Sequence, residues 1–224
     1  IYYMFSDRHR QKPDPDRRYD RIYIGGDYGQ QNATTFEAFG LDTYRKKFPG
    51  LGEYYHSGRE SGRQKSPSEY AKDLVEFMDE LHEQYENRIF YIFLDPSAKG
   101  LAEEVRRATR TGLDYQVFLR DAENDVALGI SRVQKALVFD IMSISPKQEY
   151  AVQEFGTYEY DKKSIEKGKE VPVKEADHCM DAIRYVVMGA WSKIKHWLPK
   201  DETPEEIDIC DISSREVREE DEYL

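Results

Sequence analysis

One short stretch of the chain strongly restricts the fold. The six residues from Ile89 to Leu94 are all apolar. A strand that is exposed on one face alternates apolar and polar residues, whereas a strand covered on both faces is apolar throughout. The sequence therefore predicts an α/β protein in which helices cover both faces of a sheet.

The elements around this strand alternate between helix and strand. A helix over 66–85 begins with a capping box formed by Ser66 and Glu69, with Pro67 in its first turn. Further elements are a helix over about 100–110, a strand over 115–119 and a helix over 125–137. Such alternation is typical of parallel strands that are joined by crossover helices.

The first part of the chain has a different pattern. Strands are predicted over 22–27, 34–41 and 52–56, and the short connections between them indicate an antiparallel meander. The later segments are a strand or a loop over 138–144, a helix over 146–158, a basic turn or hairpin over 162–170, and a helix from Asp177 to about Trp191. The sequence therefore predicts a sheet of mixed direction.

Three aspartates stand where predicted elements begin or end: Asp27, Asp95 and Asp181. The first two end strands, at the edge where α/β sheets bind ligands. Asp181 lies in the first turns of the last helix, beside His178 and Asp177. Converging carboxylates repel each other unless a cation compensates them, and Mg²⁺ or Mn²⁺ prefers such oxygen ligands. Two such ions about 4 Å apart would activate a water and stabilise the leaving oxygen in phosphodiester cleavage.

Each of these residues also has an ordinary structural interpretation. An aspartate at the end of a strand is commonly a turn former, and His178 alone fits a surface position. Asp177 stands at the helix start, where its side chain is expected to cap the first amides. The residues by themselves leave a metal site and these structural roles both open.

Composition excludes some classes of protein. The chain has 224 residues, enough for one domain with a sizeable core. No apolar run approaches the about 20 residues of a membrane span, and no signal peptide opens the chain. The two cysteines, Cys179 and Cys210, match neither a metal-binding spacing nor a disulfide framework, which favours a cytoplasmic protein.

The charge is uneven along the chain. The net charge is -11, yet residues 201–224 contain 11 acidic and 2 basic residues, a net of -9 that leaves -2 for the first 200 positions. The acidic excess therefore belongs mainly to the tail, and a nucleic-acid partner stays open for the rest.

Three ordered motifs resemble the nuclease domain of tailed-bacteriophage terminase large subunits. They are Gly25-Gly26-Asp27-Tyr28-Gly29, Leu94-Asp95-Pro96-Ser97-Ala98 and Asp177-His178-Cys179-Met180-Asp181-Ala182-Ile183-Arg184-Tyr185. The last motif is the most specific, and the resemblance covers about residues 20–190. It implies a ribonuclease H-like fold, in which a mixed sheet with three antiparallel first strands is flanked by helices.

The resemblance also implies a site and an activity. Asp27, Asp95 and Asp181 map onto the metal-binding acids of the family, with Asp27 bridging two Mg²⁺ or Mn²⁺ ions and His178 beside the site. The implied reaction is endonucleolytic cleavage of concatemeric viral double-stranded DNA, at packaging initiation and headful termination, in the host cytoplasm. DNA phosphates are expected to contact four lysines of the basic turn: Lys162, Lys163, Lys167 and Lys169.

The implied partners are double-stranded DNA, an N-terminal packaging ATPase domain of the same protein, the portal and the small terminase subunit, with no membrane. The chain departs from the family pattern in two places. Gln30-Gln31-Asn32 stand where the family often has Asp-Pro, and no Gly-x-x-x-x-Gly-Lys-Ser/Thr phosphate loop is present. ATP hydrolysis is therefore not expected from this chain alone.

The predicted organisation has three parts. Because the chain starts at Ile1 rather than Met, we expect it to be a fragment, with residues 1–21 a basic linker from a missing N-terminal ATPase. Residues 22–198 are expected to form the ribonuclease H-like nuclease domain. Residues 199–224 form an acidic tail whose composition predicts disorder.

Other functions stay open at this point. The nearest is another ribonuclease H-like nuclease, such as a junction resolvase. An actin-like or sugar-kinase-type ATPase is a further candidate, because Asp27-Tyr28-Gly29 followed by Thr34 and Thr35 resembles a first phosphate loop. That class needs a second Asp-Gly loop and a Gly-Gly adenosine site, which the sequence lacks. A docking module without nuclease activity is the third, and the three intact acids argue against it.

Overall fold

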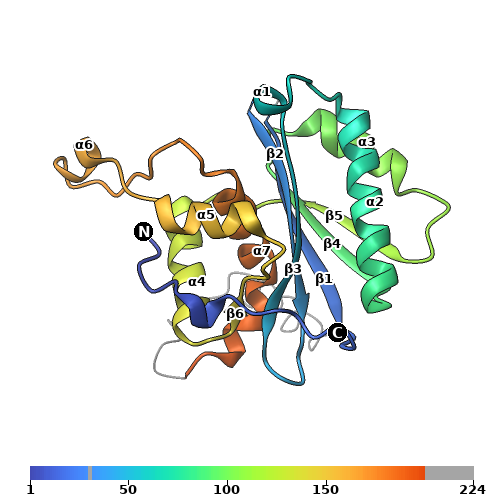
Figure 1. Cartoon of the computed structure of the whole chain (residues 1–224), viewed down its shortest axis with the longest axis horizontal. Coiled ribbons are helices and arrows are strands. Elements are labelled where there is room, and N and C mark those ends of the chain that lie inside the picture. The colour runs from blue at the N-terminus through green and yellow to red at the C-terminus, as the bar shows by residue number, and fades with distance from the viewer. Residues whose placement is uncertain (30–31, 200–224) are drawn as a thin grey trace, which may run out of the picture.

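The computed structural model describes residues 1–29 and 32–199. Its centre is a six-stranded sheet with the strand order β5-β4-β1-β2-β3-β6 (Figure 1). The strands are β1 (Arg21–Asp27), β2 (Ala33–Leu41), β3 (Phe48–Ser57), β4 (Ile89–Leu94), β5 (Gln116–Asp121) and β6 (Met142–Ser143). The α-helices are α1 (Gly58–Ser61), α2 (Pro67–Tyr85), α3 (Lys99–Ala108), α4 (Val126–Val138), α5 (Glu149–Thr157), α6 (Lys162–Ile165) and α7 (His178–Ile194), with short 3-10 turns at Asp7–His9 and Lys195–Trp197.

The sheet is mixed, as predicted. Strands β1, β2 and β3 form an antiparallel meander. Strand β4 then runs parallel to β1, β5 runs parallel to β4, and β6 runs parallel to β3. The prediction of a ribonuclease H-like sheet with three antiparallel first strands is therefore confirmed.

Strand β3 is longer than the sequence predicts. It begins at Phe48 rather than at Gly52 and includes Pro49 and Gly50. Proline and glycine have low strand propensity, so the sequence indicated a turn there. Pairing with β2, which has an irregularity between Ala38 and Phe39, overrides that local preference.

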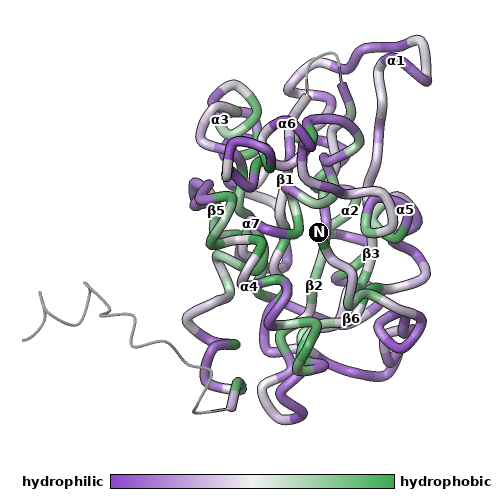
Figure 2. Tube along the Cα trace, turned by 90° about the vertical axis from the view of Figure 1, so that its left-hand side faces the viewer, coloured by the Kyte–Doolittle hydropathy of each residue, from purple (hydrophilic) through white to green (hydrophobic). Residues whose placement is uncertain are grey.

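Helices cover both faces of the sheet, with α2 and α3 on one face and α4, α5 and α7 on the other (Figure 1). Strand β4 contributes to both cores, because Phe90 and Ile92 pack on the α2 side whereas Phe93 packs on the α7 side. Figure 2 shows the apolar residues concentrated along these central elements and the polar residues along the outer turns. The prediction drawn from the continuous apolar run is confirmed.

Local signals set two of the helices. Ser66 accepts a hydrogen bond from the Glu69 amide at 3.3 Å, and Glu69 accepts one from the Ser66 amide at 2.8 Å, so the predicted capping box starts α2. The basic segment after α5 contains the single-turn helix α6, and a bridge between Tyr160 and Pro172 closes its base. This segment projects from the domain beside α5 (Figure 1).

The N-terminal segment, which the sequence analysis treats as a linker, lies against the domain. The amino group of Ile1 donates to the carbonyl of Tyr158 at 2.7 Å, and Tyr2 is buried in the core under α5. Further along, His9 is buried and its Nε2 lies 3.0 Å from the carbonyl of Leu137. The division of the chain at residues 21 and 198 stays a prediction.

Two further points concern the ends of the chain. The predicted disordered tail falls almost entirely on residues 200–224, which lie outside the described residues. Within 1–29 and 32–199, no helix has the length and apolar character needed to cross a membrane.

Candidate active site

Asp27 and Asp95 come together because their strands are neighbours. In the parallel pair β1–β4, Gly26 lies opposite Leu94, so the next residue on each strand is an aspartate. Side chains on a strand alternate between its two faces, which puts Asp27 on the same face as Gly25. A Cβ atom on Gly25 would lie 2.0 Å from the Ala182 carbonyl of α7. The absence of that atom lets α7 cross close to the strand ends.

Helix α7 contacts the acids of both strands. At its first residue, His178 donates through Nδ1 to Asp27 Oδ2 at 2.7 Å. Two turns later, Tyr185 donates through its hydroxyl to Asp95 Oδ2 at 2.8 Å. Asp181 lies between these two residues on the same helix. One helix therefore connects the three aspartates that the sequence analysis singled out.

Asp181 is held by two cations. Its Oδ1 accepts from Arg184 Nη2 at 2.6 Å, and its Oδ2 lies 3.3 Å from Lys174 Nζ. The Arg184 side chain is fully buried, so its charge depends on this carboxylate for compensation. These contacts fix the Asp181 side chain at the start of α7.

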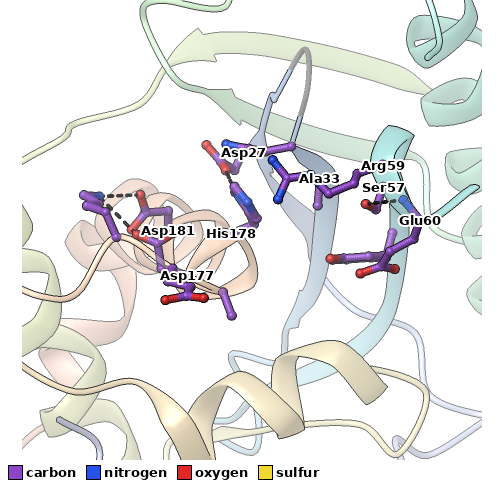
Figure 3. A pocket seen from close by; sticks show the side chains of 13 residues that line it. Asp27, Ala33, Ser57, Arg59, Glu60, Asp177, His178 and Asp181 are labelled. Carbon is purple, nitrogen blue, oxygen red and sulfur yellow. Dashed lines mark hydrogen bonds and ion pairs between the residues drawn. The ribbon is translucent and has the colours of Figure 1, made fainter. Parts of the chain in front are cut away.

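A polar pocket of about 620 Å³ opens at this position (Figure 3). Asp27, His178, Asp181 and Asp177 line it from β1 and the start of α7. The other lining residues are Asn32, Ala33, Tyr55, Ser57, Arg59, Glu60, Lys174, Glu175 and Ala176. Asp95 is not among the residues that line this pocket in the described part of the chain, and its Oδ2 is held by the hydroxyl of Tyr185. The structure therefore brings Asp27, His178 and Asp181 into one cavity and places Asp95 beside them.

The surroundings shift the pKa values of these groups. Burial raises the pKa of Asp27, although the hydrogen bond from His178 lowers it in part. The same hydrogen bond to Asp27 raises the pKa of His178 despite burial. For Asp95, burial favours the neutral form, but hydrogen bonds from Ser97 and Tyr185 outweigh it and lower the pKa. The pKa values of Asp27 and Asp95 are thus shifted in opposite directions.

The predicted capping role of Asp177 is wrong. Asp177 precedes the first residue of α7, but its side chain makes no capping hydrogen bond. Glu154 of α5 supplies the cap, because its Oε2 accepts from the amides of Cys179 and Met180 at 2.8 and 3.1 Å. Asp177 is only 6% exposed. Among the described residues its Oδ2 has no hydrogen-bond partner, but it lies 3.2 Å from Lys174 Nζ. Its carboxylate is directed to the pocket rather than to the helix amides.

A second group of acids, which sequence reasoning missed, lies in the core next to this site. Glu37 and Glu53 are opposite each other on β2 and β3, and their carboxylates and the Cys179 thiol place possible ligand atoms within 4.8 Å of one another. The sequence alone does not show that these two acids are neighbours, because this depends on the register in which β2 and β3 pair. Burial, and then the neighbouring Glu53, raise the pKa of Glu37 well above its usual range.

Protein groups already occupy the oxygens of that pair. Glu53 accepts from the amides of Tyr150 and Ala151 at 3.0 and 2.8 Å and so caps α5. Glu37 accepts from Gln148 Nε2 at 2.8 Å. Since α5 in turn provides the Glu154 cap of α7, this buried group connects the sheet to the helix that bears the site.

The four lysines predicted to contact DNA all lie in the projecting segment around α6. Lys162, Lys163, Lys167 and Lys169 are exposed, and none of them lines the pocket. Their DNA-binding role stays a prediction.

The residues of the pocket fit a divalent cation. The donors are carboxylate oxygens, which are hard ligands suited to Mg²⁺ or Mn²⁺. The buried Asp177 Oδ2, which has no hydrogen bond, is an oxygen that a cation would satisfy. A six-stranded mixed sheet with such acids at the ends of β1 and β4 matches the ribonuclease H-like fold that the resemblance implies.

Comparison with known proteins identifies the relatives within that class. No family model and no curated protein matches the chain. Among solved structures, the large terminase of a thermophilic bacteriophage is 33% identical and has a TM-score of 0.71, with 83% of this chain and 43% of that chain covered. The P22 large terminase nuclease domain has a TM-score of 0.62 at 16% identity, covering 85% of this chain and 91% of that domain.

The nuclease domain of the bacteriophage SPP1 large terminase, solved with bound Mn, has a TM-score of 0.50 at 19% identity and covers 75% of this chain and 86% of that domain. At such low identity, the P22 and SPP1 likenesses show the shared fold. The chain spans less than half the length of the large terminase from the thermophilic bacteriophage. Together the comparisons confirm the resemblance to the nuclease domains of terminase large subunits.

Proposed function

We propose that this chain is the nuclease part of a terminase large subunit, a divalent-metal-dependent endonuclease that cleaves concatemeric viral double-stranded DNA during genome packaging. One observation carries the proposal: helix α7 contacts the two aspartates at the strand ends, Asp27 and Asp95, through His178 and Tyr185, and itself contains Asp181. The similarity to terminases supports the choice of DNA as substrate.

Asp27, Asp95 and Asp181 would hold Mg²⁺ or Mn²⁺, with two ions expected. Bound there, the cations lower the pKa of a water and stabilise negative charge on the scissile phosphate. The protein supplies orientation: His178 fixes Asp27, Tyr185 fixes Asp95 and Arg184 fixes Asp181. His178 acts as a positioning residue, because its Nδ1 is engaged with Asp27.

The remaining parts of the proposal concern partners. Lys162, Lys163, Lys167 and Lys169 would contact phosphates of the DNA, which give affinity without sequence preference. By similarity to terminases, the working assembly would include a packaging ATPase domain of the same protein, the portal and the small terminase subunit, in the cytoplasm of the host cell. The acidic tail would serve contacts in that assembly.

Plasmid cleavage tests this function. Wild-type protein should nick and linearise supercoiled plasmid in the presence of Mn²⁺, and EDTA should abolish the reaction. Asp27→Ala and Asp181→Ala should lower the rate at least about 100-fold, the range typical of a lost electrostatic catalytic group. Asp114→Ala, at an exposed acid outside the pocket, is the matched control and should cleave normally. Undiminished cleavage by either pocket variant would contradict the proposal, and faster cleavage of branched than linear DNA would favour a junction resolvase.

A further inference from the structure

Lys174 places a positive charge inside the acidic pocket. It lies in the segment that leads into α7, and its Nζ is 3.2 Å from Asp177 Oδ2 and 3.3 Å from Asp181 Oδ2. Both acids line the pocket. One ammonium group therefore bridges two carboxylates at the start of the helix.

The two cations that contact Asp181 differ in their freedom to leave. Arg184 is three residues away on the same helix, and its side chain is 0% exposed, so it is a permanent partner of Oδ1. The Lys174 side chain is 63% exposed and extends from a loop on a flexible stem. Lys174 can therefore release Oδ2 to solvent or to another cation, whereas Arg184 cannot.

Asp177 explains why a cation is required at this place. Its side chain is only 9% exposed, and within residues 1–29 and 32–199 no group donates a hydrogen bond to Oδ2. A buried carboxylate without hydrogen bonds or a counter-charge is strongly disfavoured. Since Asp181 is also largely buried, the ammonium of Lys174 compensates two carboxylates that would otherwise repel each other.

We propose that Lys174 is a tethered cation on the outer side of Asp181 and that a divalent cation exchanges with it there. This inference rests on the proposed metal-dependent function. An ammonium group and a divalent cation compete for the same oxygen, because a metal ligand distance of about 2.1 Å leaves no room for a second cation on that lone pair.

Calorimetric titration with Mn²⁺ tests the competition. Lys174→Gln should bind Mn²⁺ about fivefold more tightly than wild type, which corresponds to the loss of one ion pair worth about 1 kcal/mol. Lys174→Arg retains a cation and should bind with wild-type affinity. Arg59→Gln is the matched control, since Arg59 lines the same pocket from α1 and, among the described residues, forms no ion pair with Asp181. An equal gain in Mn²⁺ affinity in Arg59→Gln would show that any lost positive charge near the pocket has this effect, and it would overturn the proposal.

Thermal unfolding separates exchange from a purely structural role. Without metal, Lys174→Gln should melt a few degrees below wild type, because two buried carboxylates lose their counter-charge. With saturating Mn²⁺ the difference should disappear, and a difference that persists would overturn the proposal.

The outcomes distinguish this inference from the function on which it rests. Wild-type protein that binds Mn²⁺, while Lys174→Gln binds it with equal or lower affinity, would reject the exchange and leave the nuclease proposal intact. Failure of both proteins to bind millimolar Mn²⁺ would reject both.

Discussion

Replacing Glu154 by glutamine should remove a large pH-dependent loss of stability. Glu154 is 6% exposed and accepts the amide hydrogens of Cys179 and Met180 at the start of α7. Burial raises its pKa from 4.5 to about 7, although the two amide bonds favour the ionised form. A carboxyl group that binds its proton more tightly in the folded than in the unfolded protein stabilises the fold at low pH, and this contribution is lost as the pH rises through the folded pKa.

The magnitude follows from the pKa difference. At about 1.4 kcal/mol per pH unit, the rise from 4.5 to about 7 corresponds to about 3 kcal/mol of unfolding free energy. Most of this contribution is lost between pH 5 and pH 8. Glutamine cannot ionise, so Glu154→Gln should not lose this contribution. Its free energy of unfolding relative to that of wild type should therefore rise by about 2 kcal/mol between pH 5 and pH 8.

Urea denaturation of both proteins at pH 5, 6, 7 and 8 measures this difference. Glu149→Gln is the control, because Glu149 lies on the same helix but is exposed; it should leave the pH dependence of wild type unchanged. A difference between wild type and Glu154→Gln that stays constant from pH 5 to pH 8 would refute the reasoning.

Three further substitutions test the packing around α7. Gly25→Ala should lower the free energy of unfolding, measured by urea denaturation, by about 3 kcal/mol, because the added Cβ would lie 2.0 Å from the α7 backbone. Gly100→Ala is the control: its added Cβ has its nearest neighbour at 3.9 Å, so its free energy of unfolding should stay within about 1 kcal/mol of wild type. Equal effects of the two would contradict this account of the helix approach. Arg184→Met should lower the free energy of unfolding by about 3 kcal/mol or more, because it removes the guanidinium that lies 2.6 Å from the buried Asp181 carboxylate. A loss below about 1 kcal/mol in urea denaturation would argue against a buried ion pair. Tyr185→Phe removes the 2.8 Å hydrogen bond to Asp95 and should lower the stability by about 1 kcal/mol in thermal unfolding. It should also weaken Mn²⁺ binding in calorimetry. An unchanged Mn²⁺ affinity would indicate that Asp95 is not a metal ligand.

Local sequence signals predicted much of the fold. The uninterrupted apolar run of β4 required helices on both faces of the sheet, and the capping box at Ser66 set the start of α2. Asp27 and Asp95 could be paired in advance because both end strands, and the carboxyl ends of parallel strands meet at one edge. These features depend on residues that are close in sequence or on rules that hold for every parallel sheet.

The contacts that the sequence did not predict all depend on tertiary pairing. Glu154 caps a helix that begins 24 residues later, and no local pattern distinguishes it from Asp177, which stands at the expected position. Glu37 and Glu53 become a pair only through the β2–β3 register. The segment over 138–144, where periodicity did not choose between strand and loop, contains the two-residue strand β6, which is too short to produce a pattern.

The structure also separates the roles of Asp177, which precedes α7, and Asp181, which lies in its first turn. Asp177 and Asp181 are both directed to the pocket, but only Asp181 is fixed by a buried arginine. Asp177→Asn should therefore retain much more nuclease activity than Asp181→Asn.

Manganese soaked into crystals of the protein tests the central claim most directly. Anomalous scattering near the manganese absorption edge locates the ions without reference to activity. The account predicts density among Asp27, Asp95 and Asp181, beside His178. Crystals without manganese there, or with manganese instead among Glu37, Glu53 and Cys179, would contradict it.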